Sequence, residues 1–501
     1  MKRVYPFIGI VFLYYFSNAQ VPDDSLRNYN WILGYGDPGN PTIYHTIFDF
    51  HADTLRLYSQ IEPSSLFMYY TNASICDTAG NLLFFSNGCG VMDSSFEYVP
   101  GAERINHGPL QDYFCDQLDG GGYANSLLVL PDWQGKKYNL IHTLPSSHPE
   151  FLIATNRLLW SKIVEVDDGA LSATQIDSTL IDTLLFTSGL AACRHANGRD
   201  WWVVASGHNS NIYHIVKIGG DSAQVHRDTI GIPTIYDEDG SGESVFSPDG
   251  SRYARYTIFS DLQVFDFDRC TGHFSHPVHV PIVDAADTVW AAGAAFSPSG
   301  RYLYAASSSY IYQFDTWASD LAASKTTVAV MDSFLVNGLP TGFYQCELAP
   351  DGRIYVSCPG GKRTFHVIEH PDSTGIACHV IQHKYLLQWA ITGGLPHFPN
   401  FRLGALPDSL CGQVSEVKQP VMLEAGLKVW PNPASKLLHI ETNVVEGTCQ
   451  ISDLYGRVVQ KLNINASQLE VEVSKWPPGT YLLSIRPSKG GLIAKKFVLV
   501  H

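Results

Sequence analysis

The chain has 501 residues, more than one ordinary hydrophobic core fills, so several domains or a repeat architecture are expected. Aromatic residues make up 12% of the sequence and charged residues 16%, which excludes disorder over most of its length. The formal net charge of −15, without a basic patch, excludes a nucleic acid partner. The composition favours a large β-protein rich in Gly and aromatic residues.

The first 19 residues have the pattern of a secretory signal peptide. Lys2 and Arg3 precede an apolar run at 4–16, and the small residues that a signal peptidase reads end at Ala19. The alternative, a membrane anchor, is disfavoured because this 13-residue run is shorter than the roughly 20 residues that cross a bilayer. We therefore predict an exported chain without a transmembrane segment, in which the ten cysteines can oxidise.

A turn motif recurs through the middle of the chain. It reads FSPDG at 246–250, FSPSG at 296–300 and LAPDG at 348–352, each time before a short aromatic strand. Weaker copies end at Gly80, Gly135 and Gly198, so that the six turn glycines are 55, 63, 52, 50 and 52 residues apart. Pro sets φ at the start of such a turn, and Gly supplies the positive φ that closes a hairpin.

Each repeat of about 50 residues predicts a four-stranded meander, which cannot bury both faces alone. Radial stacking of such sheets makes an all-β fold with a β-propeller at 20–405, the preferred reading over an array of β-sandwiches. Six repeats plus a composite blade, shared by the strands near 31–50 and a partial repeat at 393–403, give a seven-bladed β-propeller. Six blades remain the alternative.

Further stretches of this region resemble a known class of proteins. The sequences FDFDRCTG at 265–272, GLPHFPNFRLG at 394–404 and AGNLLFFSNG at 79–88 look like those of exported propeller proteins of Bacteroidota. This resemblance implies architecture and location more than an activity. The FSPDG turn is also similar to that of WD-like, TolB-like and lactonase-like propellers.

The last 75 residues predict a separate domain. A polar linker at 406–426 leads to short alternating strands over 427–501, whose spacing indicates a small Ig-like antiparallel β-sandwich. The motifs PNP at 431–433, LYGR at 454–457, PGTY at 478–481 and KKF at 495–497 follow in an order that closely resembles the type A C-terminal sorting domain of the type IX secretion system. The resemblance implies recognition by the secretion translocon, followed by removal of the domain by a sortase and attachment to surface lipopolysaccharide. The alternative is an ordinary fibronectin-like module.

An acidic stretch is a candidate metal site. Asp237, Asp239, Ser241 and Glu243 offer oxygen ligands at alternating positions, as a calcium loop does, but the later Glu of an EF-hand is missing. A solvated acidic turn is the preferred reading, with calcium as the alternative. No other cofactor is predicted.

Other chemistry has weaker support in the sequence. His273, His276 and His279 alternate in direction on a strand and predict no shared metal. No nucleophile motif appears, so no catalytic residue is predicted. In a lactonase-like propeller a channel metal would draw on residues such as Asn209, Glu243 and Asp284. Six tryptophans either stack on carbohydrate or, as preferred, pack in the core; they are Trp133, Trp201, Trp202, Trp290, Trp317 and Trp389.

These patterns predict an exported or cell-surface propeller that binds an unknown protein or carbohydrate ligand. A lactonase-like hydrolase and a structural surface-layer component are the alternatives. The long loops between repeats predict a functional site at their end of the ring, because function concentrates on varied loops. Cys346 and Cys358 lie six residues on either side of Gly352, which suggests a disulfide across the hairpin.

Overall fold

The computed structural model divides into two compact units, residues 1–412 and 413–501. The described residues are 24–36, 43–52, 54–62, 66–117, 120–147, 154–166, 169–234, 242–282, 291–336, 338–406, 411, 427–442, 444, 446–453, 457–487 and 493–500. The predicted signal peptide and most of the predicted linker lie outside them.

Within these residues the first unit contains seven antiparallel sheets of three or four strands, in which strands that are consecutive in sequence are neighbours. Three-stranded sheets come first: sheet 1 is β1 (Asn30–Gly36), β2 (Ile43–Asp49) and β3 (Arg56–Glu62), and sheet 2 is β4 (Ala73–Cys76), β5 (Leu82–Ser86) and β6 (Val91–Asp93). Sheet 3 is β7 (Leu127–Pro131), β8 (Lys137–Ser146), β9 (Ala154–Glu165) and β10 (Leu171–Leu185), and sheet 4 is β11 (Ala191–Arg194), β12 (Trp201–Ser206), β13 (Ile212–Gly219) and β14 (Ser222–Thr229). Sheet 5 is β15 (Gly242–Phe246), β16 (Arg252–Thr257), β17 (Asp261–Phe267) and β18 (Phe274–Val280). Sheet 6 is β19 (Ala292–Phe296), β20 (Tyr302–Ser307), β21 (Tyr310–Asp315) and β22 (Thr326–Val330), and sheet 7 is β25 (Cys346–Leu348), β26 (Ile354–Val356), β27 (Lys362–Ile368) and β28 (Val380–Ile391).

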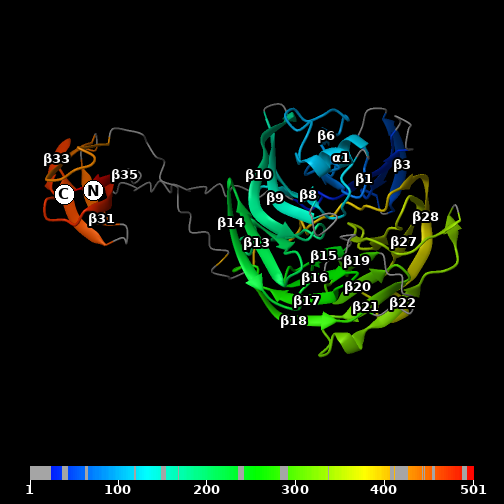
Figure 1. Ribbon diagram of the computed structural model, residues 1–501. Coiled ribbons are helices and arrows are strands. Elements are labelled where there is room, and N and C mark those ends of the chain that lie inside the picture. Colours follow the sequence, from blue (N-terminus) through cyan, green and yellow to red (C-terminus); the bar gives the residue numbers. More distant parts are fainter. Residues whose placement is uncertain are drawn as a thin grey trace, which may run out of the picture. The chain divides into compact units, whose positions relative to one another are not determined.

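Neighbouring sheets share hydrophobic cores all the way round, so the sheets form a closed ring (Figure 1). Between sheets 4 and 5, for example, Trp202 packs in one cluster with Tyr253. The ring closes where Trp31 and Phe48 of sheet 1 join Tyr355 of sheet 7, with ring centroids 5.7 Å apart between Trp31 and Tyr355. A closed ring of small antiparallel sheets that pack face to face is a β-propeller.

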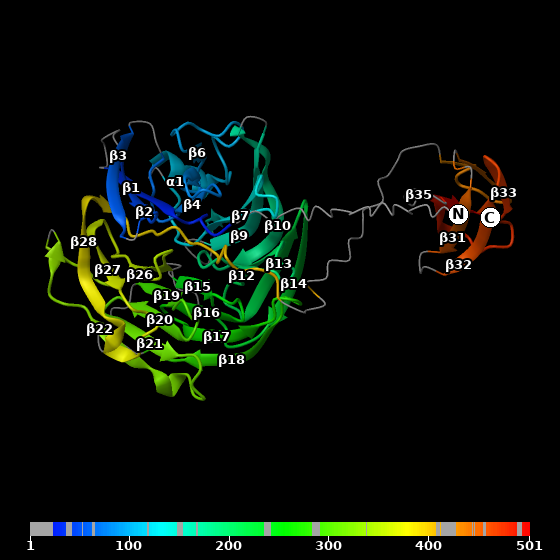
Figure 2. The same ribbon diagram turned by 180° about the vertical axis from the view of Figure 1, so that it is seen from behind.

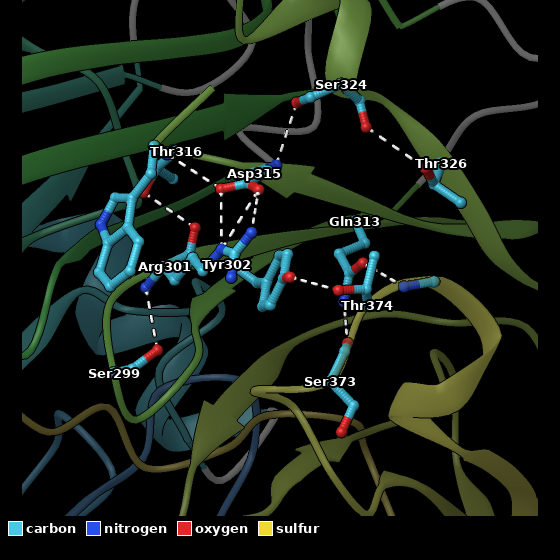
Figure 3. Close-up of polar contacts among 12 residues, drawn as sticks. Ser299, Arg301, Tyr302, Gln313, Asp315, Thr316, Ser324, Thr326, Ser373 and Thr374 are labelled. Carbon is cyan, nitrogen blue, oxygen red and sulfur yellow. Dashed lines mark hydrogen bonds and ion pairs between the residues drawn. The ribbon is translucent and has the colours of Figure 1, made fainter. Parts of the chain in front are cut away.

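Polar contacts reinforce the junction between sheets 6 and 7. The Tyr302 hydroxyl lies 2.5 Å from Thr374 Oγ1, and Gln313 Nε2 donates a hydrogen bond to the Ser373 carbonyl at 2.8 Å (Figure 3). Ser373 and Thr374 directly precede η3 (Gly375–Cys378), a 3-10 turn between β27 and β28. The segment between β27 and β28 therefore joins sheet 7 to the face of sheet 6.

The six turn glycines adopt the conformation that the sequence predicts. Each lies between the first and second strands of its sheet, with φ between 69° and 89°. Their N–H groups donate to the carbonyl three residues earlier, over 2.8 to 3.1 Å. Gly enters this region at no steric cost, so the turn prediction is confirmed. The four-stranded meander is present in sheets 3 to 7, while sheets 1 and 2 have three described strands.

The predicted composite blade is wrong. No described strand follows β28 in the first unit, and residues 392–406, here called the axial segment, instead cross the ring of sheets (Figure 2). Leu395 N donates to Gln345 Oε1 at 2.8 Å, Asn400 Nδ2 to the Pro248 carbonyl at 2.6 Å, and Leu406 N to the Ala196 carbonyl at 2.9 Å. Pro396 and Pro399 lack the N–H groups that a strand ladder needs.

Two disulfides are present among the described residues. Cys89 is bonded to Cys115 at the end of α1 (Pro109–Gln117), and Cys270, in the turn between β17 and β18, is bonded to Cys411. The predicted Cys346–Cys358 bridge is wrong, because both thiols are free and buried. Cys346 pairs with Val356 in the strand register, two residues before Cys358.

The remaining short elements of the first unit are η2 (Ala322–Ser324) and a hairpin of β23 (Leu335–Val336) and β24 (Leu339–Pro340). No helix in the described part of the chain is both long and apolar enough to cross a membrane.

The second unit has two antiparallel sheets that share one core. One sheet is β29 (Lys428–Trp430), β30 (Leu437–Glu441) and β33 (Gln468–Glu472). The other is β32 (Val458–Ile464), β31 (Gly447–Asp453), β34 (Gly479–Pro487) and β35 (Ile493–Leu499). Leu438 and Ile440 of the first pack with Ile451, Leu483 and Phe497 of the second, so the unit is a two-layer sandwich.

Candidate functional site

A cavity of about 300 Å³ opens at the end of the ring that carries the turn glycines. Its walls come from the first strands of sheets 4 to 7, from the turns of sheets 5 to 7, from Asn28 and from the axial segment. The residues that line it are Asn28, Ala191, Ala192, Val245, Phe246, Pro248, Ala295, Phe296, Pro298, Cys346, Glu347, Leu348, Ala349, Pro350, Gly352, His397, Phe398, Pro399, Asn400 and Arg402. Apolar and proline side chains dominate, as in small-molecule sites.

Two buried ionisable side chains interrupt this apolar lining. Glu347 on β25 and His397 on the axial segment are 7% and 5% exposed, with Glu347 Oε2 3.3 Å from His397 Nδ1. A second carboxylate, Glu243 on β15, lies beside them, and the three side chains place one ligand atom each within 4.8 Å of the others. Three distant parts of the chain thus meet near the middle of the ring.

Glu243 is held by hydrogen bonds from three other parts of the ring. Its Oε1 accepts from Asn125 Nδ2 at 3.0 Å, and its Oε2 accepts from the backbone N–H groups of Ala294 at 2.8 Å and Cys346 at 3.0 Å. Gln345 Nε2 in turn donates to Asn125 Oδ1 at 2.8 Å. This carboxylate therefore connects the first strands of sheets 5, 6 and 7 with the segment that leads into sheet 3.

Burial governs the protonation of the three groups. It raises the pKa of Glu243 to about 7, against the opposing effects of the nearby His397 and of the hydrogen bonds that Glu243 accepts. Burial also raises the pKa of Glu347, although its hydrogen bond and proximity to His397 act the other way. For His397, burial lowers the pKa, but the hydrogen bond and charge of Glu347 outweigh it and the pKa is raised.

These three side chains already have hydrogen-bond partners without a metal ion. Two carboxylates and an imidazole are the ligand types that a divalent metal binds, and their spacing permits it. However, both Glu243 oxygens already accept N–H bonds, and His397 already bonds to Glu347. Of these three side chains, Glu347 and His397 line the cavity and offer hydrogen-bonding groups to an organic ligand.

The predicted site residues have different positions from those the sequence suggests. Glu243 is 1% exposed on β15 and does not belong to a solvated acidic turn. Asp237, Asp239 and Ser241 lie outside the described residues, as does Asp284. Asn209 is exposed in the turn between β12 and β13.

The cavity also lies at the opposite end of the ring from the expected functional loops. The expectation favoured the varied loops between sheets, yet the turn residues Pro248, Pro298 and Pro350 line the cavity. The axial segment explains this position, because it fills the middle of the ring and brings His397 towards the turns.

The sequence contains an overlooked signal for Glu347. In the three best copies of the turn motif, the residue five before the glycine is Val245, Ala295 and Glu347. A carboxylate at a position that is otherwise apolar indicates a special role, because buried charges need dedicated partners. His397 has no such signal, since its place in the axial segment depends on the closure of the ring.

The tryptophans do not form one exposed surface. Trp201 and Trp202 are 1% and 4% exposed in the core, which confirms the preferred reading for these two. Trp389 stacks on Tyr44 with ring centroids 3.9 Å apart. Trp317 is exposed, and its ring centroid lies 5.4 Å from the Arg301 guanidinium carbon. Trp133 is half-buried, and Trp290 lies outside the described residues.

Residues 428–500 match the model of the secretion system C-terminal sorting domain. The chain carries a type IX sorting domain. This domain directs export by the type IX secretion system to the cell surface or the medium. Among curated proteins, no sequence matches the chain well enough to count as a relative.

Solved structures resemble the chain at low sequence identity. A functionally unknown protein from Desulfotomaculum acetoxidans is 13% identical, with a TM-score of 0.40, over 74% of this chain and 99% of that one. PorZ, a surface component of the type IX secretion system of Porphyromonas gingivalis, is 12% identical with a TM-score of 0.30, over 91% and 68%. A putative 6-phosphogluconolactonase from Bacteroides fragilis is 13% identical with a TM-score of 0.40, over 74% and 98%. At these TM-scores, the fold is assigned from the strand topology alone.

Proposed function

We propose that this protein is an exported seven-bladed β-propeller that binds a small organic ligand in the cavity at the turn end of the ring. The seven sheets are its blades, and the C-terminal unit is an Ig-like sandwich. The observation that carries the proposal is the buried Glu347–His397 pair in a cavity of about 300 Å³ that is lined mainly by apolar side chains. Such a volume is at the small end of ligand sites, roughly 300 to 1,000 Å³.

The lining defines the class of ligand. Phe246, Phe296 and Phe398 offer aromatic surface to an apolar body, while Glu347 and His397 offer one hydrogen-bonding position. The ligand is therefore a small ring or branched aliphatic compound with at least one hydroxyl or amide group, because each buried polar group needs a partner and Asn28, Asn400 and Arg402 also line the cavity.

Ligand-observed NMR with a fragment library of small alcohols and amides tests this binding. The isosteric Glu347→Gln variant keeps the cavity volume and removes the charge, and Ala295→Leu fills the cavity. The matched control is Glu97→Gln, an exposed position away from the cavity. We expect some fragments to bind the parent and the control with equal affinity. The same fragments are expected to bind Glu347→Gln at least tenfold more weakly and not to bind Ala295→Leu. Equal binding to the parent and Ala295→Leu would contradict the proposal.

We also propose the division of the chain into a signal peptide at 1–19, a propeller at 20–405, a linker at 406–426 and a sorting domain at 427–501. In this division the sorting domain contacts the translocon and the sortase, and the propeller remains outside the cell. Calcium binding by Asp237, Asp239 and Ser241 stays a prediction, now without Glu243, whose carboxylate accepts three N–H bonds on β15.

A further inference from the structure

Two neighbouring sheets bring a second group of metal-ligating side chains together on the outside of the ring. His226 and Asp228 lie on β14, the last strand of sheet 4, and His273 precedes β18, the last strand of sheet 5. One ligand atom of each lies within 4.8 Å of the others, and the two imidazole rings have centroids 4.7 Å apart. These residues are distinct from the Glu243, Glu347 and His397 cluster.

Backbone groups hold two of the three side chains in place. His226 Nε2 lies 3.0 Å from the Gly272 carbonyl oxygen. A carbonyl oxygen only accepts hydrogen bonds, so Nε2 carries the proton and Nδ1 of the neutral ring has the lone pair that a metal would bind. Phe274 N donates to Asp228 Oδ2 at 2.7 Å. Metal-binding histidines usually donate their second N–H to a carbonyl or carboxylate in this way, which fixes the tautomer and the ring orientation.

Gly272 makes the first of these contacts possible. Its φ of +76° is rarely adopted by other residues, and a Cβ atom here would lie 2.7 Å from the Trp202 ring and 2.9 Å from that of His226. The turn between β17 and β18 therefore approaches sheet 4 closely enough for its carbonyl to orient His226. A larger residue would push the turn, and with it His273, away from β14.

We propose that His226, Asp228 and His273 bind one Zn²⁺ ion that bridges sheets 4 and 5. Two imidazole nitrogens and one carboxylate oxygen are a common zinc ligand set that leaves a fourth position open to solvent. His273 Nδ1 and Asp228 Oδ1 lie 2.8 Å apart and share a hydrogen bond, which the zinc ion would replace. Zinc bonds of about 2.0–2.2 Å place ligand atoms roughly 3.3–3.5 Å apart, so this pair has to separate slightly. In contrast to the buried Glu243 cluster, His273 is 58% exposed, so its side chain can rotate to make room for the ion.

Nearby His–Asp pairs of the same hairpin lack this arrangement and provide controls. His276 Nδ1 lies 3.0 Å from Asp266 Oδ2, and His279 Nε2 lies 2.9 Å from Asp261 Oδ2. Neither pair belongs to a three-ligand group among the described residues. A single His–Asp contact is therefore common on this edge, whereas the second imidazole is specific to His226.

Isothermal titration of the full chain with zinc chloride tests the proposal. We expect the parent to bind one more equivalent of Zn²⁺ than His273→Ala, and Asp228→Asn to weaken that site at least tenfold, while His276→Ala titrates like the parent. Asp228→Asn retains an oxygen for the Phe274 N–H, and circular dichroism checks that each variant is folded. Identical stoichiometry and affinity in the parent and His273→Ala would overturn the proposal.

Cobalt supplies a second readout that does not depend on counting sites. Co²⁺ bound by two imidazoles and a carboxylate in low coordination has strong visible absorption bands, so the parent minus His273→Ala difference spectrum is expected to contain them. A featureless difference spectrum would likewise overturn the site.

Discussion

Asn125 Nδ2 donates a hydrogen bond to Glu243 Oε1 at 3.0 Å, although 118 residues separate the two side chains in the sequence. Asn125 precedes sheet 3 and Glu243 lies in sheet 5, so the bond spans sheet 4 across the interior of the ring. This buried carboxylate is thus a common acceptor for the segment before sheet 3 and for sheets 6 and 7.

Replacing Glu243 by Ala removes that acceptor from three buried donors. An unsatisfied buried donor costs about 1–3 kcal/mol, so Glu243→Ala is expected to lower the free energy of unfolding by about 3 kcal/mol or more. Urea unfolding of the purified chain measures this. The exposed Glu97→Ala is the control and is expected to stay within about 0.5 kcal/mol of the parent. Equal stability of the two variants would show that the network contributes nothing.

The N-terminal end of the described chain is fixed by a buried ion-pair network. Asp24, 5% exposed, lies 2.9 Å from Arg27 Nε and 2.7 Å from Arg194 Nη2. Asp24→Ala leaves two buried guanidinium groups without this partner and is expected to destabilise by about 3–5 kcal/mol. Asp221 is a matched control, because it also lies between two cations, Lys137 and Lys162, but is 68% exposed. Asp221→Ala is expected to cost less than about 1 kcal/mol in the same unfolding experiment.

Acid is expected to destabilise the propeller partly through His142. Burial lowers its pKa from 6.5 to about 4, although nearby Asp177 opposes the shift. Between these values the unfolded state binds a proton that the native state does not, so the stabilising contribution is complete above pH 6.5 and is lost as pH falls towards 4.

Comparison of the parent with His142→Gln isolates this effect from other groups, such as Glu243, whose raised pKa acts in the opposite direction. The stability advantage of the parent over the variant is expected to shrink by about 2 kcal/mol between pH 7.5 and pH 5. Unfolding curves at the two pH values measure it. A constant difference would mean that His142 keeps an ordinary pKa in the folded protein.

Peptide mapping of the exported protein under non-reducing conditions is expected to recover two linked pairs, Cys89–Cys115 and Cys270–Cys411. Cys346 and Cys358 are expected to react with a thiol reagent only after unfolding, because both are buried. Recovery of a Cys346–Cys358 peptide would contradict the strand register described above.

Deletion of residues 427–501 is expected to retain the protein in the periplasm with the propeller folded, since the two units are compact on their own. Cell fractionation and protease accessibility measure location, and the melting temperature of the retained protein measures folding. The full-length chain in the same cells is the control. Normal amounts of the truncated chain at the surface would contradict sorting by this domain.

Local chemistry explains which parts of the fold could be predicted. Gly250 and its five counterparts are predictable because a turn is decided within five residues, and the PNP and KKF motifs are predictable because they recur as units. The course of the axial segment could not be predicted, because its partners Gln345, Pro248 and Ala196 lie 50, 152 and 210 residues away in the sequence. Glu347 and His397 meet for the same reason, as does His226 with His273. The sequence pattern indicates strands and turns, but ring closure determines which distant side chains become neighbours.

The axial segment also constrains how such a protein can evolve. In a tandem-repeat protein each repeat contacts mainly its two neighbours, so a copy can be added or lost with local rearrangement when nothing else joins the repeats. Here the 15 residues of the axial segment form hydrogen bonds to Tyr69, Gln345, Pro248 and Ala196, on opposite sides of the ring. An added repeat would widen the ring and move these partners beyond the reach of the axial segment. The number of repeats is therefore tied to the length of a segment that is not itself a repeat.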